Sequence, residues 1–250
     1  MMLNPESTQF GHEAVSPEQK TEKVIEVFDS VASKYDLMND IMSGGVHRIW
    51  KNHLIRKIRP RAGLHYLDVA GGTGDIAFRI REKVGNGAKI TLCDLNTEML
   101  SVGRDRAINK GYLNDFEWIT GNAEALPLPD NSVDVYTIAF GLRNVTRIDN
   151  ALTDAFRVLR PGGRFFCLEF SHMEENYMQK LYDAYSYAFI PKAGELITKD
   201  RASYQYLVES IRKMPTQNAL KDRISKAGFS KSTFENLSFG IAAIHSGSKR

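Results

Sequence analysis

Residues 67–75 read LDVAGGTGD, an acid within a short apolar run, then a cluster of glycines and a second acid. Glycines that follow a strand let the backbone approach a ligand closely and adopt positive φ, so such a turn is typical of a nucleotide site. A P-loop needs a Lys and a Ser or Thr after its last glycine, whereas Asp75 and Ile76 follow Gly74 here. The stretch predicts a nucleotide-like ligand held by a loop that is not a P-loop.

Two ligands remain for this loop. Gly72, Gly74 and Ala77 fit the dinucleotide pattern G-x-G-x-x-G/A. The other ligand is S-adenosylmethionine, whose sulfonium and ammonium groups suit an acid beside the glycines. Asp94 ends the next apolar run about 20 residues on, where a carboxylate accepts the ribose hydroxyls of either ligand. The glycine loop by itself leaves both open.

Features outside the loop favour S-adenosylmethionine. A short-chain dehydrogenase of similar length needs a Tyr-x-x-x-Lys pair, and no Tyr in this chain is followed four residues later by Lys. Asp68 opens a stretch similar to the D/E-x-G-x-G-x-G pattern of class I methyltransferases, with Ala70 in place of the first glycine. Asn122 and Ala123 follow the third apolar run, where an amide and a backbone N–H suit the adenine edge.

Composition indicates one folded core with appendages. The 250 residues are 42% hydrophobic and 25% charged. The 33 basic and 30 acidic residues are spread along the chain, so nucleic-acid binding is not expected. Cys93 and Cys167 lie in apolar runs without a C-x-x-C partner, which predicts buried, reduced thiols, and the histidines show no metal-ligand spacing. No apolar run reaches the roughly 18 to 20 residues of a membrane span.

Hydrophobic periodicity predicts the fold. From Leu64 onward, short apolar runs alternate with amphipathic stretches, which indicates a parallel sheet with right-handed crossovers and a site at the carboxyl ends of its strands. The last two strands, around TFENL and IAAIH, have so short a connection that they must be antiparallel. We therefore predict an α/β, doubly wound, Rossmann-like fold with a mostly parallel seven-stranded sheet, an antiparallel last strand and a helical cap.

The same patterns divide the chain into segments. Ser16-Pro17-Glu18-Gln19 offers an N-cap and a capping box for a first helix, and a second helix is expected from about Val46 to Lys57. The predicted segments are a flexible tail (1–15), an N-terminal helical cap (16–60), a cofactor-binding core (61–170), a helical tyrosine-rich insertion (171–213) and a C-terminal helix with a strand pair (214–250).

Several stretches are specific enough to indicate a family. They are YDLMNDIMSGGVHRIW (35–50), LDVAGGTGD (67–75), AFGLRNVT (139–146), VLRPGGRFFCLEFS (158–171) and SYQYLVESI (203–211). Together they resemble the ubiquinone/menaquinone biosynthesis C-methyltransferase family, and the resemblance runs from about Thr8 to the end of the chain. It implies methyl transfer from S-adenosylmethionine to a ring carbon of a polyprenylated quinol, either 2-methoxy-6-polyprenyl-1,4-benzoquinol or demethylmenaquinol.

The resemblance also implies a cofactor site. The family's cofactor positions fall on Thr73, Asp94, Asn122 and Ala123, and a position that is often serine falls on Ala139. Asp68, Gly72 and Gly74 complete the predicted set. Only about seven residues precede the resemblance, too few for a mitochondrial transit peptide, so we expect a bacterial cytoplasmic protein.

Three residues are catalytic candidates. A quinol ring carbon becomes a strong nucleophile when a hydroxyl ionises, and a cation such as Arg143 can lower the pKa of that hydroxyl by roughly 1 to 3 units. Arg143 can equally be structural, paired with an acid such as Asp134 or Glu169. Asn144 is its neighbour in the same motif. His47, a water or a tyrosine hydroxyl would accept the proton, although a lone histidine on a helix also serves as a packing residue.

The tyrosine-rich segment is expected to cover a greasy substrate, with Tyr182, Tyr185 and Tyr204 lining the pocket. A polyprenyl tail would stay in the bilayer, so weak peripheral membrane contact through the cap helices, at the inner face of the membrane, is expected. A methyltransferase for another small aromatic, a protein that only binds the cofactor, and an NAD-binding oxidoreductase are the alternatives. The sequence leaves open whether the chain forms a homodimer or joins a quinone-biosynthesis complex.

Overall fold

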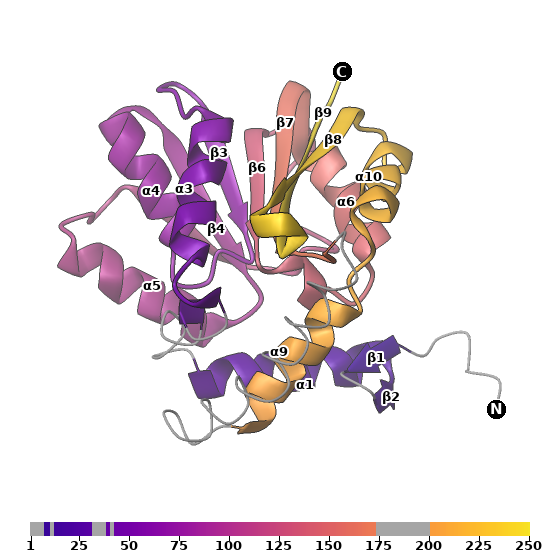
Figure 1. The fold of residues 1–250 in the computed structure, drawn as a ribbon. Coiled ribbons are helices and arrows are strands. Elements are labelled where there is room, and N and C mark those ends of the chain that lie inside the picture. Colours follow the sequence, from indigo (N-terminus) through magenta and orange to yellow (C-terminus); the bar gives the residue numbers. More distant parts are fainter. Residues whose placement is uncertain (1–7, 11–12, 32–38, 41–42, 174–200) are drawn as a thin grey trace.

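A seven-stranded sheet forms the centre of the protein, in the strand order β5-β4-β3-β6-β7-β9-β8 (Figure 1). The strands are β3 (His65–Val69), β4 (Lys89–Asp94), β5 (Phe116–Thr120), β6 (Val133–Ala139), β7 (Leu159–Phe170), β8 (Ser230–Leu237) and β9 (Ala242–Ser248). Neighbours from β5 to β7 are parallel, and β9 lies antiparallel between β7 and β8. The computed structural model describes residues 8–10, 13–31, 39–40, 43–173 and 201–250. The predicted fold class is confirmed.

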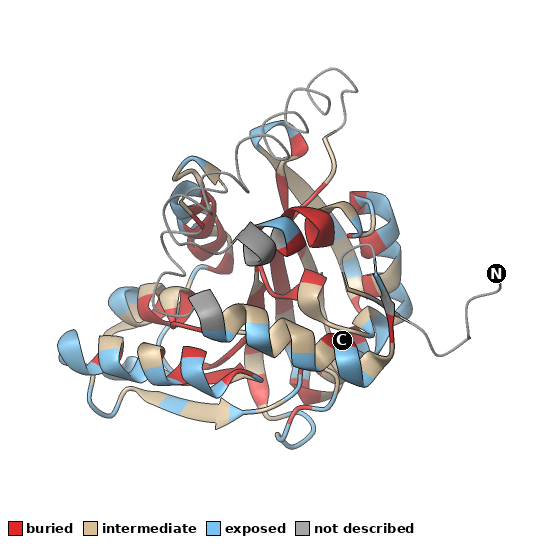
Figure 2. Cartoon of the chain, turned by 90° about the horizontal axis from the view of Figure 1, so that it is seen from below, coloured by how far each residue is buried: buried red, intermediate tan, exposed pale blue. Residues whose placement is uncertain are grey.

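Helices cover both faces of the sheet. They are α3 (His47–Ile58), α4 (Asp75–Val84), α5 (Thr97–Asn109), α6 (Ile148–Val158) and α10 (Gln217–Lys226). β3 is buried along its whole length, and its side chains alternate between two apolar cores: Tyr66 packs with α3 and α4, and Leu67 packs with α6 and α10. In Figure 2 the central strands are red, while the outer faces of the helices are largely pale blue. Cys93 and Cys167 are buried free thiols, as predicted.

The strand order reverses beside β3. The chain runs outward from β3 through β4 to β5 and then returns to β6 on the other side of β3. In open α/β sheets, the crevice at such a switch point, outside the carboxyl ends of the strands, holds the ligand. LDVAGGTGD (67–75) begins within β3 and continues into the loop after it, and AFGLRNVT (139–146) begins at the last residue of β6, so the two motifs meet at this crevice.

A cap lies beyond these strand ends. It contains α1 (Pro17–Val31) and α9 (Arg201–Arg212), which run side by side below the sheet in Figure 1. The capping box predicted for α1 is present, since Gln19 N–H donates to Ser16 Oγ (3.2 Å) and Ser16 N–H donates to Gln19 Oε1 (2.9 Å). The second predicted cap helix, α3, instead packs on the sheet through Trp50 and Leu54. Of these two helices, only α1 covers the strand ends.

Part of the predicted flexible tail is ordered. Strands β1 (Thr8–Phe10) and β2 (Glu13–Val15) form an antiparallel hairpin. The Phe10 ring stacks on the Tyr206 ring with centroids 4.2 Å apart, and such aromatic contact offsets the entropy lost when the segment is ordered. The sequence does not reveal this contact because the two residues are far apart in the chain. Within the described residues, no helix combines the length and apolar character needed to cross a bilayer.

The packing of α3 on the sheet predicts that substitutions at two of its aliphatic side chains change the stability of the protein by different amounts. Leu54 is 0% exposed, whereas Ile49 is 63% exposed. Leu54→Ala is expected to lower the free energy of unfolding by about 2 to 5 kcal/mol because it removes buried methylene groups and leaves a cavity. Ile49→Ala, the control, is expected to change it by less than about 0.5 kcal/mol. Urea unfolding monitored by circular dichroism measures both, and equal losses would contradict this packing.

Candidate active site

A cavity opens at the carboxyl ends of β3, β4 and β6, with α1 as its roof. It encloses about 780 Å³, its mouth included, and we call it the cofactor cavity. Apolar side chains of α1 and polar groups from the strand ends share its wall. The lining residues used below are Val24, Phe28, Ala70, Gly72, Asp94, Asn122, Ala123, Phe140, Gly141 and Asn144.

The loops after β3 and β6 touch at the base of this cavity. A Cβ on Gly141 would collide with the Cβ of Ala70, so the two loops pack at a distance that only glycine permits. Ala70 and Phe140 both have positive φ, +49° and +57°, which is uncommon for residues with a side chain. Ala70 takes the place of the first glycine in the methyltransferase pattern and still adopts the left-handed turn. The turn therefore forms despite the replacement.

Asp94 faces the cavity from the end of β4. Its Oδ2 accepts the Gly72 N–H (2.8 Å) and its Oδ1 accepts the Asn96 N–H (2.9 Å). Burial raises the pKa of Asp94 to about 6, against the opposing effect of these N–H donors. Each carboxylate oxygen has a second lone pair, so both remain able to accept ribose hydroxyls. Asn122 and Ala123 lie on the same wall, where their sequence motif places them.

Asp68 is buried beneath the glycine loop. Its Oδ1 accepts the Thr137 hydroxyl (2.8 Å), whereas its Oδ2 has no hydrogen-bond partner among the described residues. A Cβ built on Gly71 would lie 3.2 Å from this oxygen. Burial raises the pKa of Asp68 to about 7. An unpartnered buried carboxylate beside a ligand cavity is suited to a cationic ligand.

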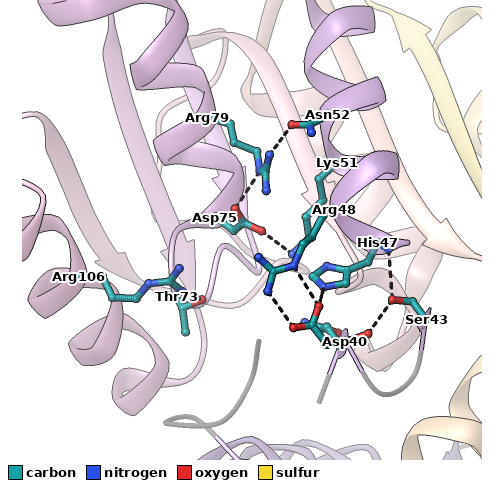
Figure 3. Close-up of polar contacts among 11 residues, drawn as sticks. Asp40, Ser43, His47, Arg48, Lys51, Asn52, Thr73, Asp75, Arg79 and Arg106 are labelled. Carbon is teal, nitrogen blue, oxygen red and sulfur yellow. Dashed lines mark hydrogen bonds and ion pairs between the residues drawn. The ribbon is translucent and has the colours of Figure 1, made fainter. Parts of the chain in front are cut away.

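Thr73, Gly74 and Ala139 do not line the cavity. Thr73 Oγ1 accepts a hydrogen bond from Arg106 Nη1 (2.7 Å), so its side chain points toward α5 (Figure 3). Gly74 has a φ of +85°, and a Cβ there would lie 2.8 Å from the Phe78 ring. Any contact of these three residues with the cofactor would come from the backbone.

His47 lies in a separate polar cluster around the start of α3 (Figure 3). Its side chain is 2% exposed, and Nε2 lies 2.8 Å from Asp40 Oδ1. Burial, with the Lys51 charge, lowers the pKa of His47. Lys51 Nζ donates to Asp75 Oδ2 (2.7 Å), which ties α3 to the end of the glycine loop. The structure does not bring His47 together with Arg143, and His47 lines neither cavity described here.

Arg143 lies in the 3-10 turn η3 (Leu142–Asn144) after β6, with its side chain fully buried. Nη1 donates to Glu169 Oε1 (3.0 Å) and to the Phe140 carbonyl, and the Arg143 N–H donates to Glu169 Oε2 (3.2 Å). Of the two acids considered from the sequence, Glu169 is the partner, while Asp134 pairs with Arg160. Arg143 Nε and Nη2 have no partner among the described residues. The pair is neutral overall, but two buried N–H donors stay available.

A second cavity, which we call the Arg143 cavity, lies beside the first. It encloses about 1200 Å³, its mouth included, and shares Val145 and Thr146 with the cofactor cavity. Tyr206 lines it, and the Tyr206 hydroxyl donates to Asn144 Oδ1 (3.1 Å). Burial raises the pKa of Tyr206, so this hydroxyl stays protonated. Arg143 and Asn144 thus stand at the junction of the two cavities.

Comparison with known proteins agrees with this geometry. Residues 16–249 match the ubiE/COQ5 methyltransferase family. The chain belongs to this family. It is 51% identical over 275 residues to the mitochondrial 2-methoxy-6-polyprenyl-1,4-benzoquinol methylase of Bos taurus, with 97% of this chain and 83% of the relative covered. It is 53% identical over 242 residues to the ubiquinone/menaquinone biosynthesis C-methyltransferase UbiE of Brucella abortus, with 96% of this chain and 90% of that relative covered.

Solved structures show the same fold at low sequence identity. A SAM-dependent methyltransferase of Thermotoga maritima, described as a possible histamine N-methyltransferase, superposes with a TM-score of 0.63 at 18% identity, covering 91% of this chain and all of that one. This member of the ubiE/COQ5 family is therefore a methyltransferase, and its cofactor is S-adenosylmethionine. The cofactor supplies an electrophilic methyl group on a sulfonium.

The residues of the cofactor cavity fit this cofactor. Asp94, Asn122 and Ala123 line the cavity and offer a carboxylate and amide groups to a ribose and an adenine. Asp68 does not line it but lies buried beneath the glycine loop, with one oxygen unpartnered among the described residues. Among the described residues, no group of three or more His, Cys, Asp or Glu side chains could hold a metal ion.

Sequence reasoning proposed Tyr204 and did not single out Tyr206, which lines the Arg143 cavity. Tyr206, Ser210 and Lys213 have helical spacing and all line the Arg143 cavity, a pattern that was readable from the sequence. The side chain of Tyr204, like Tyr182 and Tyr185, lies outside the described residues.

The raised pKa values of Asp68 and Asp94 predict how cofactor affinity depends on pH. Both carboxylates bind the cofactor best when ionised, so binding releases the protons that they hold below their pKa values of about 7 and about 6. The Kd for S-adenosylmethionine is expected to fall about tenfold or more from about pH 5.5 to about pH 7.5 and then level off. Calorimetric titration in buffers of different ionisation enthalpy measures both the Kd and the protons released. A Kd that does not change over this range would contradict the proposed contacts, and Asp94→Asn should remove the lower part of the curve, near pH 6, and leave the part due to Asp68.

Proposed function

We propose that this methyltransferase methylates a ring carbon of a polyprenylated quinol, either 2-methoxy-6-polyprenyl-1,4-benzoquinol or demethylmenaquinol. The names of its relatives support this substrate class, since they include a 2-methoxy-6-polyprenyl-1,4-benzoquinol methylase and a ubiquinone/menaquinone biosynthesis C-methyltransferase. The structural observation that carries the proposal is the pair of unpartnered, buried N–H donors of Arg143, beside the cofactor cavity.

Carbon methylation needs electron density on the ring. A quinol hydroxyl that titrates like tyrosine, near 10, is only about one-thousandth ionised at pH 7. Hydrogen bonds to the ionised form lower that pKa, and Arg143 Nε and Nη2 are able to donate two of them to one oxygen. Because Glu169 balances the charge of Arg143, the effect comes from directed hydrogen bonds more than from net charge.

The geometry also narrows the choice of proton acceptor. His47 lines neither cavity, and Tyr206 keeps its proton because burial raises its pKa. Tyr206 acts instead through Asn144, whose Oδ1 it binds, and so holds the amide at the wall of the cofactor cavity. We assign the hydroxyl proton of the quinol to water at the open mouth of the Arg143 cavity. After the methyl group is transferred, the ring carbon loses its hydrogen as a proton to the same water and the oxygen is reprotonated, so one proton is released overall.

Apolar residues keep water from the reacting centre. Val24 and Phe28 of α1 and Phe140 of the loop after β6 line the cofactor cavity. A sulfonium loses its charge as its methyl group leaves, so a water-poor cavity favours transfer over the charged ground state. The remaining contribution is positioning of the ring carbon in line with the methyl group.

The experiment that tests this function uses methyl-labelled S-adenosylmethionine and reduced quinone extract from a methylation-deficient strain. Mass spectrometry then locates the label. Label on a ring carbon is the expected result, and it identifies the benzoquinol or naphthoquinol nucleus. If the cofactor binds but no quinol acquires label, the substrate proposed here is wrong, and a different small aromatic is the acceptor.

The role of Arg143 predicts a loss of turnover rather than of cofactor affinity. Arg143→Gln is expected to lower kcat about 100-fold or more, because donors to a developing oxyanion contribute on that scale, while the Kd for S-adenosylmethionine stays nearly unchanged. Steady-state kinetics and calorimetry measure the two quantities. Arg160→Gln, which removes an arginine paired with Asp134 at the surface, is the control and should leave kcat unaltered.

A second variant separates catalysis from folding. Arg143→Gln leaves Glu169 buried without its partner, which destabilises the fold. The double variant Arg143→Gln/Glu169→Gln removes both charges and is expected to recover stability while kcat stays low. Recovery of kcat together with stability would show that Arg143 has only a structural role.

A further inference from the structure

The mouth of the Arg143 cavity gathers cations from distant parts of the chain. Lys20 of α1, Arg147 before α6, Lys213 after α9 and Arg223 of α10 line it, and we call these four residues the basic mouth. Asp149 is the one acid among the described residues of this lining. Arg143 and Tyr206 are buried and form the floor, whereas Arg147 and Lys213 are exposed. The cations therefore surround the opening through which the floor is reached.

Close acidic partners neutralise only part of this charge. Glu124 lies 3.7 Å from Arg147 Nη1 and also accepts the Arg147 N–H (2.9 Å), so Arg147 is partly compensated. Arg223 Nη1 lies 3.8 Å from Asp149, a loose contact between exposed side chains. Lys20 Nζ donates to the Val145 carbonyl (3.1 Å). Lys213 is exposed; burial lowers the pKa of its ammonium, and the Glu209 charge opposes this. Burial lowers the pKa of Lys20, and the Glu124 charge opposes this. The Lys213 charge lowers the pKa of Lys20 further, because the two ammonium groups repel each other across the mouth.

The start of helix α6 adds to the positive potential. Arg147 is its N-cap residue and caps it with no side-chain hydrogen bond, and Ile148, Asp149 and Asn150 of the first turn line the cavity. The unpaired N–H groups of a helix N-terminus carry a partial positive charge and bind anions. The hydroxyl of Ser210 and the amide of Asn150 are further polar groups in this wall.

We propose that the basic mouth binds a phosphate group, and that the headgroup of an anionic phospholipid supplies it. Four cations around one opening, with a helix N-terminus in the wall, suit the charge and the oxygen-rich shape of a phosphate. The choice of a phospholipid as the source rests on the proposed function, since a polyprenyl tail partitions into a bilayer. A headgroup held at the mouth would turn the Arg143 floor toward the membrane that contains the quinol.

The test uses vesicles without quinol, so that it does not depend on catalysis. The full-length protein is floated with vesicles of phosphatidylcholine alone or with about 30% phosphatidylglycerol, at low and at high salt. Binding is expected only to the anionic vesicles and only at low salt. The variant Lys213→Gln/Arg147→Gln is expected to lower the partition coefficient about tenfold or more, since each basic residue near an anionic surface contributes substantially.

A matched control removes the same charge elsewhere. Lys83→Gln/Lys110→Gln takes two cations from α4 and the end of α5. These helices lie on the opposite side of the sheet from α6 and α10 (Figure 1). This control should bind anionic vesicles like the wild type. Thermal melting and the Kd for S-adenosylmethionine verify that all variants are folded. Loss of vesicle binding equal in both double variants would overturn the proposal, because it would reflect net charge alone.

A second arm distinguishes the source of the phosphate. Line broadening of inorganic phosphate in ³¹P spectra is recorded with the wild type and with Lys213→Gln/Arg147→Gln. Broadening by the wild type alone, without vesicle binding, would support a phosphate site with a soluble ligand and reject the lipid. Absence of both effects would overturn the proposal. Methylation of a detergent-solubilised quinol, measured in parallel, tests the proposed function separately, because it does not require a membrane.

Discussion

The close contact between the loops after β3 and β6 is the constraint on which the site depends. Gly141 lies so near Ala70 that no side chain fits between them, and both neighbouring turns adopt positive φ. This contact sets the glycine loop, with Asp68 below it, directly beside the turn that carries Arg143 and Asn144. Because the two loops belong to adjacent parallel strands, cofactor and acceptor groups are brought to the same edge of the sheet.

Buried charge is arranged differently on the two sides of that contact. Asp68 keeps one oxygen without a partner, and its raised pKa reflects the cost of ionising it there. Arg143 is paired with Glu169, yet keeps two donors without partners. Unpartnered buried groups are costly to a fold and are retained where a ligand completes them. A cation-binding acid and an oxygen-binding arginine at one junction suit methyl transfer from a sulfonium to an ionised quinol.

The fold was predictable from the sequence, and so were four of the residues that line the cofactor cavity, Gly72, Asp94, Asn122 and Ala123. The alternation of apolar runs and the glycine loop placed Asp94, Asn122 and Ala123 at strand ends, and the structure has all three on one wall. Predictions failed where a side chain has two plausible directions. Thr73 turns to Arg106, and His47 turns to Asp40 and away from the site. Local spacing does not determine these directions, because they depend on which partner the folded chain supplies.

The sequence by itself determined the sheet, the switch point, the family and the chemistry of the cofactor. Strand and helix periods are local, and the motifs are contiguous, so they survive without a structure. The tertiary structure alone decided that Arg143 pairs with Glu169, that Tyr206 reaches Asn144, and that scattered cations meet in a basic mouth. Each of these joins residues distant in sequence, and side-chain contacts between distant residues exist only after the chain has packed.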